Sequence, residues 1–222
     1  MDLSSESVIL NAFRAAGRSI IVRSLGSVPY QSTQEAMRDF VARATDCTDE
    51  EIWLLQHPQT YTRGTACEQE TLMPSTIPII ESDRGGQITY HGPGQIVLYP
   101  LLSLRRNGLS VKGLVETLEQ SVIDLLAEYQ IEAQRRDGAP GVYVNDHKIA
   151  ALGLRIRRGW CYHGLSLNVD MDLDPFKNID PCGFTGLQVT QMSDLISGEP
   201  LDASRVGQNL VDRFCSLLPT SE

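Results

Sequence analysis

The chain has 222 residues, of which 41% are hydrophobic and 21% charged, an ordinary globular composition. This composition excludes disordered, collagen-like and disulfide-scaffold proteins, and the length allows one domain or at most two small ones. Nineteen basic against 28 acidic residues leave a net charge of -9. Such an acidic surface disfavours general binding to nucleic acid or to anionic membranes.

The first half of the chain predicts one helix among short strands. Residues 1–17 are expected to form an N-terminal extension, partly helical, ahead of a single domain over residues 18–222. Apolar residues at helical spacing predict an amphipathic helix over 31–44. The side chains expected on its inner side are Ala36, Phe40, Val41 and Ala44. Short β-type runs predict strands over residues 20–22, 51–56, 77–81 and 95–100.

The second half opens with the clearest helix, over residues 111–129, and a last helix is expected over 202–217. The residues expected to face inward from the first of these are Leu114, Leu118, Val122, Leu125 and Leu126. Strands are predicted over residues 141–144, 147–157 and 162–169, with Asn145-Asp146 as a hairpin turn. Adjacent strands with few helices favour an α+β fold, one domain with a mixed sheet, over a doubly wound parallel sheet.

The five cysteines and the N-terminal stretch show no metal, disulfide or export pattern. The cysteine number is odd, no pair has CxxC spacing, and the four histidines form no ligand cluster. A structural zinc site needs four ligands in close pairs, so we expect no metal. Arg14 and Arg18 interrupt the first apolar run, which argues against a signal peptide or a membrane span. We therefore expect a cytoplasmic protein with reduced thiols.

Residues 84–95 (RGGQITYHGPGQ) contain four glycines and a proline. Such a run lets the backbone approach a ligand closely and direct N–H groups at it. A simpler interpretation is two tight turns that flank a short strand over 87–90. We favour a binding loop, because turns alone rarely gather Arg84, Tyr90 and His91 so tightly around glycines. The spacing matches neither a P-loop nor a dinucleotide fingerprint.

Lys148 and Cys182 are the two candidates for chemistry. Lys148 enters a strongly apolar strand, where Lys is uncommon unless paired or functional, although an edge-strand Lys can also serve to block aggregation. Cys182 lies in a loop with Pro before it and Gly after it (IDPCGFTG), so its thiol is expected to be accessible. Cys161 and Cys215 are expected to be packing residues instead.

A nucleophilic cysteine needs a base or a cation beside it, because a free thiol is only a few per cent ionised at neutral pH. His91, His147 and His163 could supply the base. Lys148 would serve equally, since its ammonium stabilises a thiolate and its amine can accept a proton. Spacing along the chain does not choose among these four.

Four segments together resemble the octanoyltransferases of protein lipoylation: RGGQITYHGPGQIVLYPLL, APGVYVNDHKIAALGLRIRRG, YHGLSLNV and DPFKNIDPCGFTG. They occur in the order found in that family, and the resemblance covers about residues 20–195. These enzymes transfer an octanoyl group from octanoyl-acyl carrier protein to a lysine of apo lipoyl domains. The resemblance implies a single domain with a mixed sheet, similar to biotin and lipoate protein ligases, and no cofactor.

By this resemblance, Cys182 is the nucleophile that carries the octanoyl group as a thioester, and Lys148 lowers the pKa of that thiol and exchanges protons. Three stretches resemble the parts of the family that bind substrate. Their residues are Arg84, Gly85, Gly86, Gln87, Ile88, Thr89, Tyr90, His91, Ala151, Leu152, Gly153, Gly164, Leu165 and Ser166.

The implied partners are octanoyl-acyl carrier protein and the apo lipoyl domains of 2-oxoacid dehydrogenase complexes and of the glycine cleavage H protein. Such carriers are generally acidic, so Arg155, Arg157 and Arg158 form a candidate docking patch. The alternatives are Arg105-Arg106 and Arg135-Arg136.

Three other functions stay open. The first is an ATP-dependent lipoate or octanoate protein ligase. The second is a cysteine hydrolase that uses Cys182 with a histidine, and the third is a module that binds acylated proteins without acting on them.

Overall fold

The computed structural model describes residues 8–15, 18–67, 76–179, 188–197 and 200–219. A seven-stranded sheet in the order β1-β2-β3-β7-β10-β9-β8 forms the centre of the fold. Its strands are β1 (Val8–Ala15), β2 (Arg18–Ser27), β3 (Glu50–Gln56), β7 (Gln95–Leu101), β8 (Val142–Val144), β9 (His147–Arg157) and β10 (Trp160–Asn168). Only β2 and β3 run parallel, and every other neighbouring pair is antiparallel, so the sheet is mixed.

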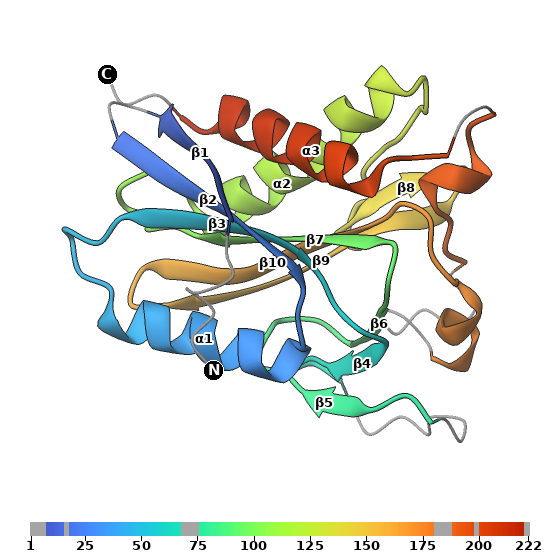
Figure 1. The fold of residues 1–222 in the computed structure, drawn as a ribbon, viewed down its shortest axis with the longest axis horizontal. Coiled ribbons are helices and arrows are strands. Elements are labelled where there is room, and N and C mark those ends of the chain that lie inside the picture. The colour runs from blue at the N-terminus through green and yellow to red at the C-terminus, as the bar shows by residue number, and fades with distance from the viewer. Residues whose placement is uncertain (1–7, 16–17, 68–75, 180–187, 198–199, 220–222) are drawn as a thin grey trace.

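A second sheet of three short strands lies at one end of the first (Figure 1). Its order is β5-β4-β6, and its strands are β4 (Thr60–Arg63), β5 (Ile79–Glu81) and β6 (Ile88–His91). Tyr61 and Tyr90 pack between this sheet and the short helix η1 (Asp174–Asn178), which contributes Phe176. A second short helix, η3 (Met192–Asp194), follows later in the chain.

In the described part of the chain, three α-helices cover the two faces of the large sheet (Figure 1). Helices α2 (Val111–Glu128) and α3 (Ala203–Leu217) lie on one face, and α1 (Tyr30–Arg43) lies on the other. The first face holds the larger core, in which residues of both helices meet alternate residues of the strands. The core under α1 is smaller and aromatic, with Trp53, Tyr99 and Trp160 beside Met37. Among the described residues, none of the helices is both long and apolar enough to span a bilayer.

The long elements agree with the sequence-based expectations. All five inward residues named for the helix over 111–129 are fully buried, and Ser110 caps its N-terminus by accepting a hydrogen bond from the Gly113 N–H. Strand β9 has the predicted bounds, and the preceding turn residues Asn145 and Asp146 have φ angles of +47° and +68°. Such a pair of left-handed residues is typical of a type I′ hairpin. The predicted α+β class with a mixed sheet is confirmed.

One expectation about a short segment is wrong, and another is confirmed only in part. Val8–Ala15, within the extension expected to be partly helical, form strand β1, which pairs antiparallel with β2. The strand predicted over 77–81 is shorter, because β5 contains only Ile79–Glu81. In both cases the state of the segment depends on the strand with which it pairs, β2 for β1 and β4 for β5, and local residue pattern does not show that pairing.

Candidate active site

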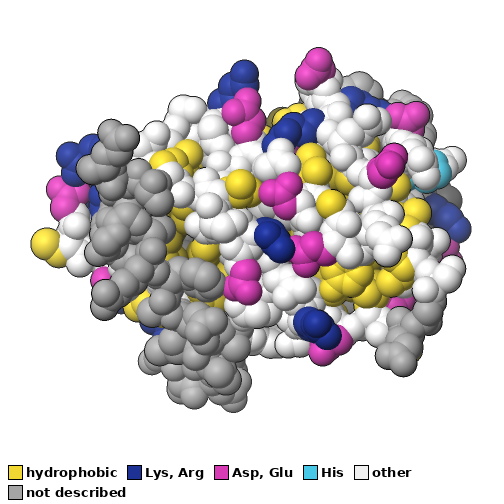
Figure 2. Space-filling view, turned by 90° about the horizontal axis from the view of Figure 1, so that it is seen from above, with side chains coloured by type: hydrophobic (Ala, Val, Ile, Leu, Met, Phe, Trp, Pro, Cys, Tyr) yellow, Lys and Arg dark blue, Asp and Glu magenta, His cyan; other side chains and the backbone are white. Residues whose placement is uncertain are grey.

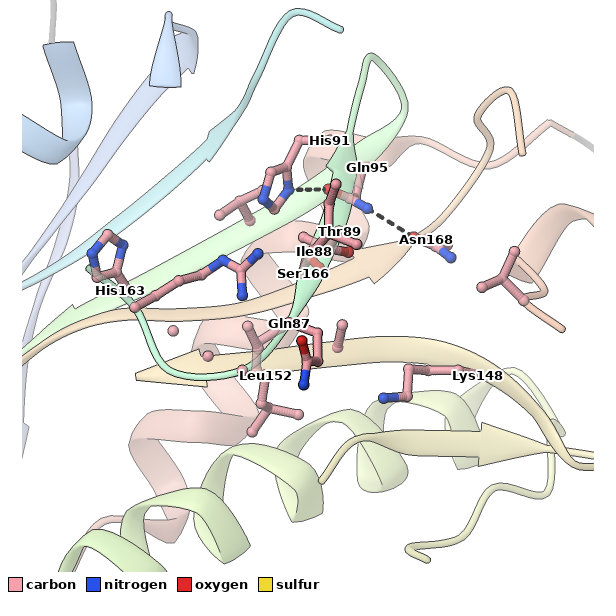
Figure 3. Close-up of a pocket in the computed structure, with 18 of the residues that line it drawn as sticks. Gln87, Ile88, Thr89, His91, Gln95, Lys148, Leu152, His163, Ser166 and Asn168 are labelled. Atoms are coloured by element: carbon pink, nitrogen blue, oxygen red, sulfur yellow. Dashed lines mark hydrogen bonds between the residues drawn. The ribbon is translucent and has the colours of Figure 1, made fainter. Parts of the chain in front are cut away.

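A pocket lies where the small sheet meets strands β9 and β10 (Figure 3). It is lined by the loop that precedes β6, by β6 itself, by β7, β9 and β10, and by one residue on each side of residues 180–187. These residues are Arg84, Gly86, Gln87, Ile88, Thr89, His91, Gln95, Val97, Tyr99, Lys148, Ile149, Ala151, Leu152, Gly153, His163, Gly164, Leu165, Ser166, Asn168, Phe176 and Val189. In Figure 3, Lys148 and His163 lie at opposite ends of this lining.

The pocket brings together the three stretches proposed for substrate binding and Lys148. Two proposed residues are not part of the lining: Gly85, and Tyr90, which is buried against Tyr61 and Phe176. Cys182 lies outside the described residues. His147, one of the open candidates for a base, is half-buried at the start of β9 and does not line the pocket.

The glycine-rich segment consists of an irregular loop and a short strand. Its second part is the short strand β6, and its first part, residues 84–87, is an irregular loop that lines the pocket. Strand β8 pairs with β9 only up to Ala150. Beyond this point the loop over residues 84–87 lies beside β9 in place of β8, and the Gly85 N–H donates to the Leu154 carbonyl at 2.9 Å. A Cβ at Gly153 would lie 2.9 Å from the Gly85 carbonyl oxygen, so the close approach needs glycine.

Lys148 is 4% exposed, which rules out the simple role of an exposed Lys that protects a sheet edge. Its Nζ donates to the Pro140 carbonyl at 3.1 Å and lies 5.3 Å from the centre of the Tyr143 ring. The side chain points toward Gln87 and Leu152 (Figure 3). Its backbone N–H donates to the Gln188 carbonyl at 2.9 Å, so the chain that follows residue 187 returns alongside Lys148.

Arg84 adds a second buried cation to the lining, with 8% of its surface exposed. Its guanidinium donates to the carbonyl and hydroxyl oxygens of Thr62 and to the Gly85 carbonyl, all of which are uncharged. A buried cation held only by neutral acceptors is costly unless a charge develops near it. Arg84 therefore makes the pocket favourable for negative charge.

A directed chain of hydrogen bonds runs behind the pocket. The Gln95 amide nitrogen donates to the Asn168 side-chain oxygen at 2.9 Å, so the Gln95 oxygen faces His91 Nδ1, at 2.7 Å, as acceptor. His91 then carries its proton on Nδ1, and its Nε2 accepts from the Thr62 hydroxyl at 3.3 Å. Asn168 donates in turn to the Thr190 carbonyl at 3.0 Å. The chain ties β4, β6, β7 and β10 to the segment that pairs with Lys148.

Three histidines surround Tyr30 in the interior: His57, His91 and His163. Burial lowers the pKa of His57 to about 4, and it also lowers the pKa of His163 and, more strongly, that of His91. All three rings are therefore neutral at pH 7. None carries the positive charge that would stabilise a thiolate.

His163 is held in an uncommon backbone conformation, with a φ of +56°. Its Nε2 lies 2.8 Å from an Asp83 carboxylate oxygen. Partial burial by itself would raise the pKa of Asp83, but hydrogen bonds from His163, Tyr162 and Arg38 outweigh it and hold that pKa well below its usual range. Asp83 is thus an anion at neutral pH, and it fixes the orientation of His163.

The described cysteines offer no competing nucleophile in the pocket. Burial raises the pKa of both Cys161 and Cys215 to about 12, so these thiols stay protonated, as expected for packing residues. Cys47 and Cys67 do not line the pocket. In the part of the chain that the structure describes, no group of three His, Cys, Asp or Glu residues could hold a metal ion.

Sequence reasoning missed the polar residues that support the site from behind, above all Gln95, Asn168 and Thr62. Gln95 stands at the start of a buried strand and Asn168 at the end of another, where an apolar residue would be ordinary. A polar residue in a run that is otherwise buried was the available signal, because it needs a partner in the interior.

Comparison with known proteins shows the family of the chain and supports its fold. The family model of the lipoyl protein ligase A/B catalytic domain matches residues 31–215. The octanoyltransferase of Dechloromonas aromatica is 56% identical, over 86% of this chain and 92% of its own. A crystal structure of lipoate-protein ligase A bound with ATP has a TM-score of 0.71 at 14% identity, and covers 88% of this chain and 85% of its own.

A biotin protein ligase from Aquifex aeolicus shares the fold more distantly, with a TM-score of 0.55 and 13% identity over 89% of this chain and 69% of its own. These two structural likenesses show the fold alone. The high identity to a curated octanoyltransferase over most of both chains, together with the family match, shows the family. The chain belongs to the octanoyltransferases, within the lipoyl protein ligase A/B catalytic-domain family.

Proposed function

We propose that this enzyme transfers an octanoyl group from octanoyl-acyl carrier protein to a lysine of an apo lipoyl domain, through a thioester on Cys182. The observation that carries the proposal is buried Lys148 in a pocket lined by all three stretches expected to bind substrate. Phe176 and Val189, six residues before and seven after Cys182 in the sequence, line the same pocket. Both sides of the Cys182 segment therefore border the proposed site.

In the first half-reaction, the Cys182 thiolate attacks the thioester carbonyl of the octanoyl carrier. The new carbon–sulfur bond to Cys182 forms, the bond to the carrier thiol breaks, and the leaving thiolate takes a proton from the Lys148 ammonium. Exchange of one thioester for another is nearly neutral in energy, so the step needs no ATP. The Arg84 cation lies in the lining, where it would stabilise the oxyanion of the tetrahedral intermediate.

In the second half-reaction, the amine of the acceptor lysine attacks the acyl-enzyme. The amide bond forms, the carbon–sulfur bond to Cys182 breaks, and the Lys148 amine takes the proton that the attacking nitrogen loses. The thiolate and the ammonium are thereby restored, so one proton cycles on Lys148 in each turnover. Ping-pong kinetics follow from the covalent intermediate. The proposal places the enzyme in the cytoplasm, because its nucleophilic thiol must stay reduced.

Intact-mass spectrometry tests the intermediate. Mixed with octanoyl-acyl carrier protein, the enzyme should gain the mass of one octanoyl group, and apo lipoyl domain should then discharge it. The Cys182→Ser variant should gain no thiol-linked adduct, and Cys47→Ser serves as the matched control that still does. Absence of an adduct, with modification of the lipoyl domain that requires ATP and free octanoate, would replace this proposal by the ligase.

We also propose that acidic carriers dock on Arg155 and Arg157. Both are exposed and follow the pocket-lining Gly153 at two-residue intervals along β9, so all three lie on the same face of that strand. No ion pair among the described residues includes either arginine. The alternative patches are engaged with acids, since Arg105 pairs with Asp46 and Arg136 with Asp146.

The face that carries α2 and α3 shows basic and acidic side chains interspersed, which does not favour an acidic partner there (Figure 2). The double variant Arg155→Glu/Arg157→Glu should therefore raise the KM for octanoyl-acyl carrier protein by about tenfold at low salt, with kcat unchanged. Arg105→Glu is the control and should leave KM within about twofold. A KM that is insensitive both to salt and to the double reversal would contradict docking at this patch.

A further inference from the structure

One peptide group, between Pro140 and Gly141, touches both Lys148 and a buried acid on helix α2. Its carbonyl oxygen accepts a hydrogen bond from Lys148 Nζ at 3.1 Å. Its N–H, which belongs to Gly141, donates to Glu119 Oε1 at 2.9 Å. The carbonyl and the N–H of a trans peptide point in opposite directions. The carboxylate and the ammonium therefore lie on opposite sides of the same rigid unit.

This arrangement couples the two charged groups although they do not touch. A carboxylate that accepts from a peptide N–H makes a charge-assisted hydrogen bond, and successive hydrogen bonds polarise one another. The negative charge of Glu119 thus makes the Pro140 carbonyl a stronger acceptor for Lys148 Nζ. The position of this carbonyl, in turn, fixes where the end of the Lys148 side chain lies.

The local backbone is built for this contact. Gly141 has a φ of +142°, a value that favours glycine. A Cβ at this position would lie 2.8 Å from the Ala150 carbonyl oxygen and 3.0 Å from Lys148 Cε. The peptide can approach the lysine only because residue 141 has no side chain.

Glu119 is an uncommon residue for its place in α2. It is 5% exposed, on the side of the helix that packs against the sheet, where its neighbours Leu118 and Val122 are fully buried. Its second oxygen pairs with Arg135 Nε at 3.1 Å, and the side chain of Arg135 is 39% exposed. An acid that served only this surface ion pair would not need to reach the interior.

We propose that Glu119 is a positioning residue for octanoyl transfer, which holds the Pro140–Gly141 peptide so that its carbonyl fixes Lys148 Nζ in the pocket. This inference rests on the proposed role of Lys148 in proton transfer. It assigns to a helix outside the pocket lining a direct influence on the reacting end of that lysine. Loss of the influence should lower the rate of chemistry without weakening substrate binding.

Steady-state kinetics of three variants test the proposal. Glu119→Ala removes the acceptor and should lower kcat by at least about tenfold, with the KM for octanoyl-acyl carrier protein unchanged, because a displaced catalytic group affects the chemical step. Glu119→Gln keeps an oxygen that can accept from the Gly141 N–H and should restore kcat to within about threefold. Arg135→Gln removes only the surface partner and should behave like the wild type.

If Glu119→Ala fails to fold, a spectroscopic measurement on Glu119→Gln still tests the proposal. In a ¹H–¹⁵N correlation spectrum, the Gly141 amide proton of Glu119→Gln should move upfield, because a neutral oxygen is a weaker acceptor than a carboxylate. Glu128→Gln, on the same helix but paired with Arg213 of α3, should leave that resonance in place.

Wild-type kcat in a folded Glu119→Ala variant, an equal loss in Arg135→Gln, or an unmoved Gly141 resonance would each overturn the inference. Failure of the proposed function is a separate result. It would appear as a wild-type enzyme that gains no octanoyl adduct, whatever residue 119 is.

Discussion

Two buried cations, Lys148 and Arg84, line a pocket whose described residues include neither Asp nor Glu. The nearby histidines are neutral at pH 7 because burial lowers their pKa values. The positive charge available to the reaction therefore comes from these two side chains, within a chain of net charge -9. Such a local field favours a thiolate and an oxyanion. Among the candidate partners that the sequence left open, it is the reason that we propose Lys148 rather than His91 or His163.

Replacement of Lys148 by arginine separates charge from proton transfer. Arginine keeps the cation but does not deprotonate in proteins, so it cannot accept a proton from the attacking amine. We expect Lys148→Arg to slow octanoyl transfer by about 10²-fold or more, the usual size of an acid–base contribution. Single-turnover rates of acylation and deacylation measure the effect. Lys112→Arg, at an exposed lysine paired with Glu116, is the control; normal rates in both variants would contradict the role of Lys148.

The residues that the sequence identified are those whose type is unusual for the local pattern around them. A lysine that enters an apolar strand and a run of glycines both stand out locally, and both reach the pocket. At Glu119 and Asn168 the sequence shows a polar residue among apolar ones but not its partner, because the partners are 22 residues away along the chain, at Gly141 and Thr190. Hydrogen bonds of this kind are made only after the sheet and the helices have packed, so residue pattern alone cannot show them.

Whether the sequence predicts a secondary-structure element depends on the length of the element and on how far it relies on pairing with another strand. Helix α2 and strand β9 carry periodic apolar residues over many positions and have caps or turns of recognisable chemistry. Strands β4 and β6 have only four residues each and gain their stability from pairing with one another. The pocket lies at such short elements, so the fold class was easier to predict than the shape of the site.

The contact between the glycine-rich loop and strand β9 supports the pocket at the level of elements. Substitution of Gly153 by alanine would place a methyl group 2.9 Å from the Gly85 carbonyl oxygen and push the loop away. We expect Gly153→Ala to raise the KM for octanoyl-acyl carrier protein and lower kcat/KM by about tenfold, a cost typical of a displaced binding element.

Gly113→Ala is the matched control for this change. Gly113 lies in the first turn of α2, where the nearest atom to a new Cβ is the Ser110 hydroxyl oxygen at 3.3 Å. Alanine is favoured over glycine within helices, so transfer should continue at the wild-type rate. A Gly153→Ala enzyme with unchanged kinetics would show that the loop can give way at no cost.

On the scale of the whole molecule, the polar interior behind the pocket joins the two sheets and α1. Tyr30 of α1 lies against histidines that stand between β3 and β4, on β6 and on β10. Its hydroxyl is 2.7 Å from that of Ser82, just beyond β5. This cluster takes the place of an apolar core where the parts meet. Its stability therefore depends on protonation, unlike that of the large core under α2 and α3.

Acid should destabilise the fold through this cluster. The pKa of His57 is about 4 in the folded state and about 6.5 unfolded. Between these values the unfolded chain binds more protons, so the free energy of unfolding falls as the pH falls. For His57 alone the loss between pH 7 and pH 5 is about 2 kcal/mol. His163 and His91 add to it, and Asp83, with its lowered pKa, adds a further loss below about pH 4.

Urea unfolding at pH 7 and pH 5 measures this dependence. The His57→Gln variant should be less stable at pH 7, because Gln does not reproduce both hydrogen bonds of the ring, to the Val28 carbonyl and the Tyr99 hydroxyl. Its loss of stability between the two pH values should be smaller than that of the wild type by about 2 kcal/mol. His147→Gln, outside the cluster, should keep the wild-type loss. An equal loss in all three proteins would mean that the acid sensitivity arises elsewhere than at the buried imidazoles.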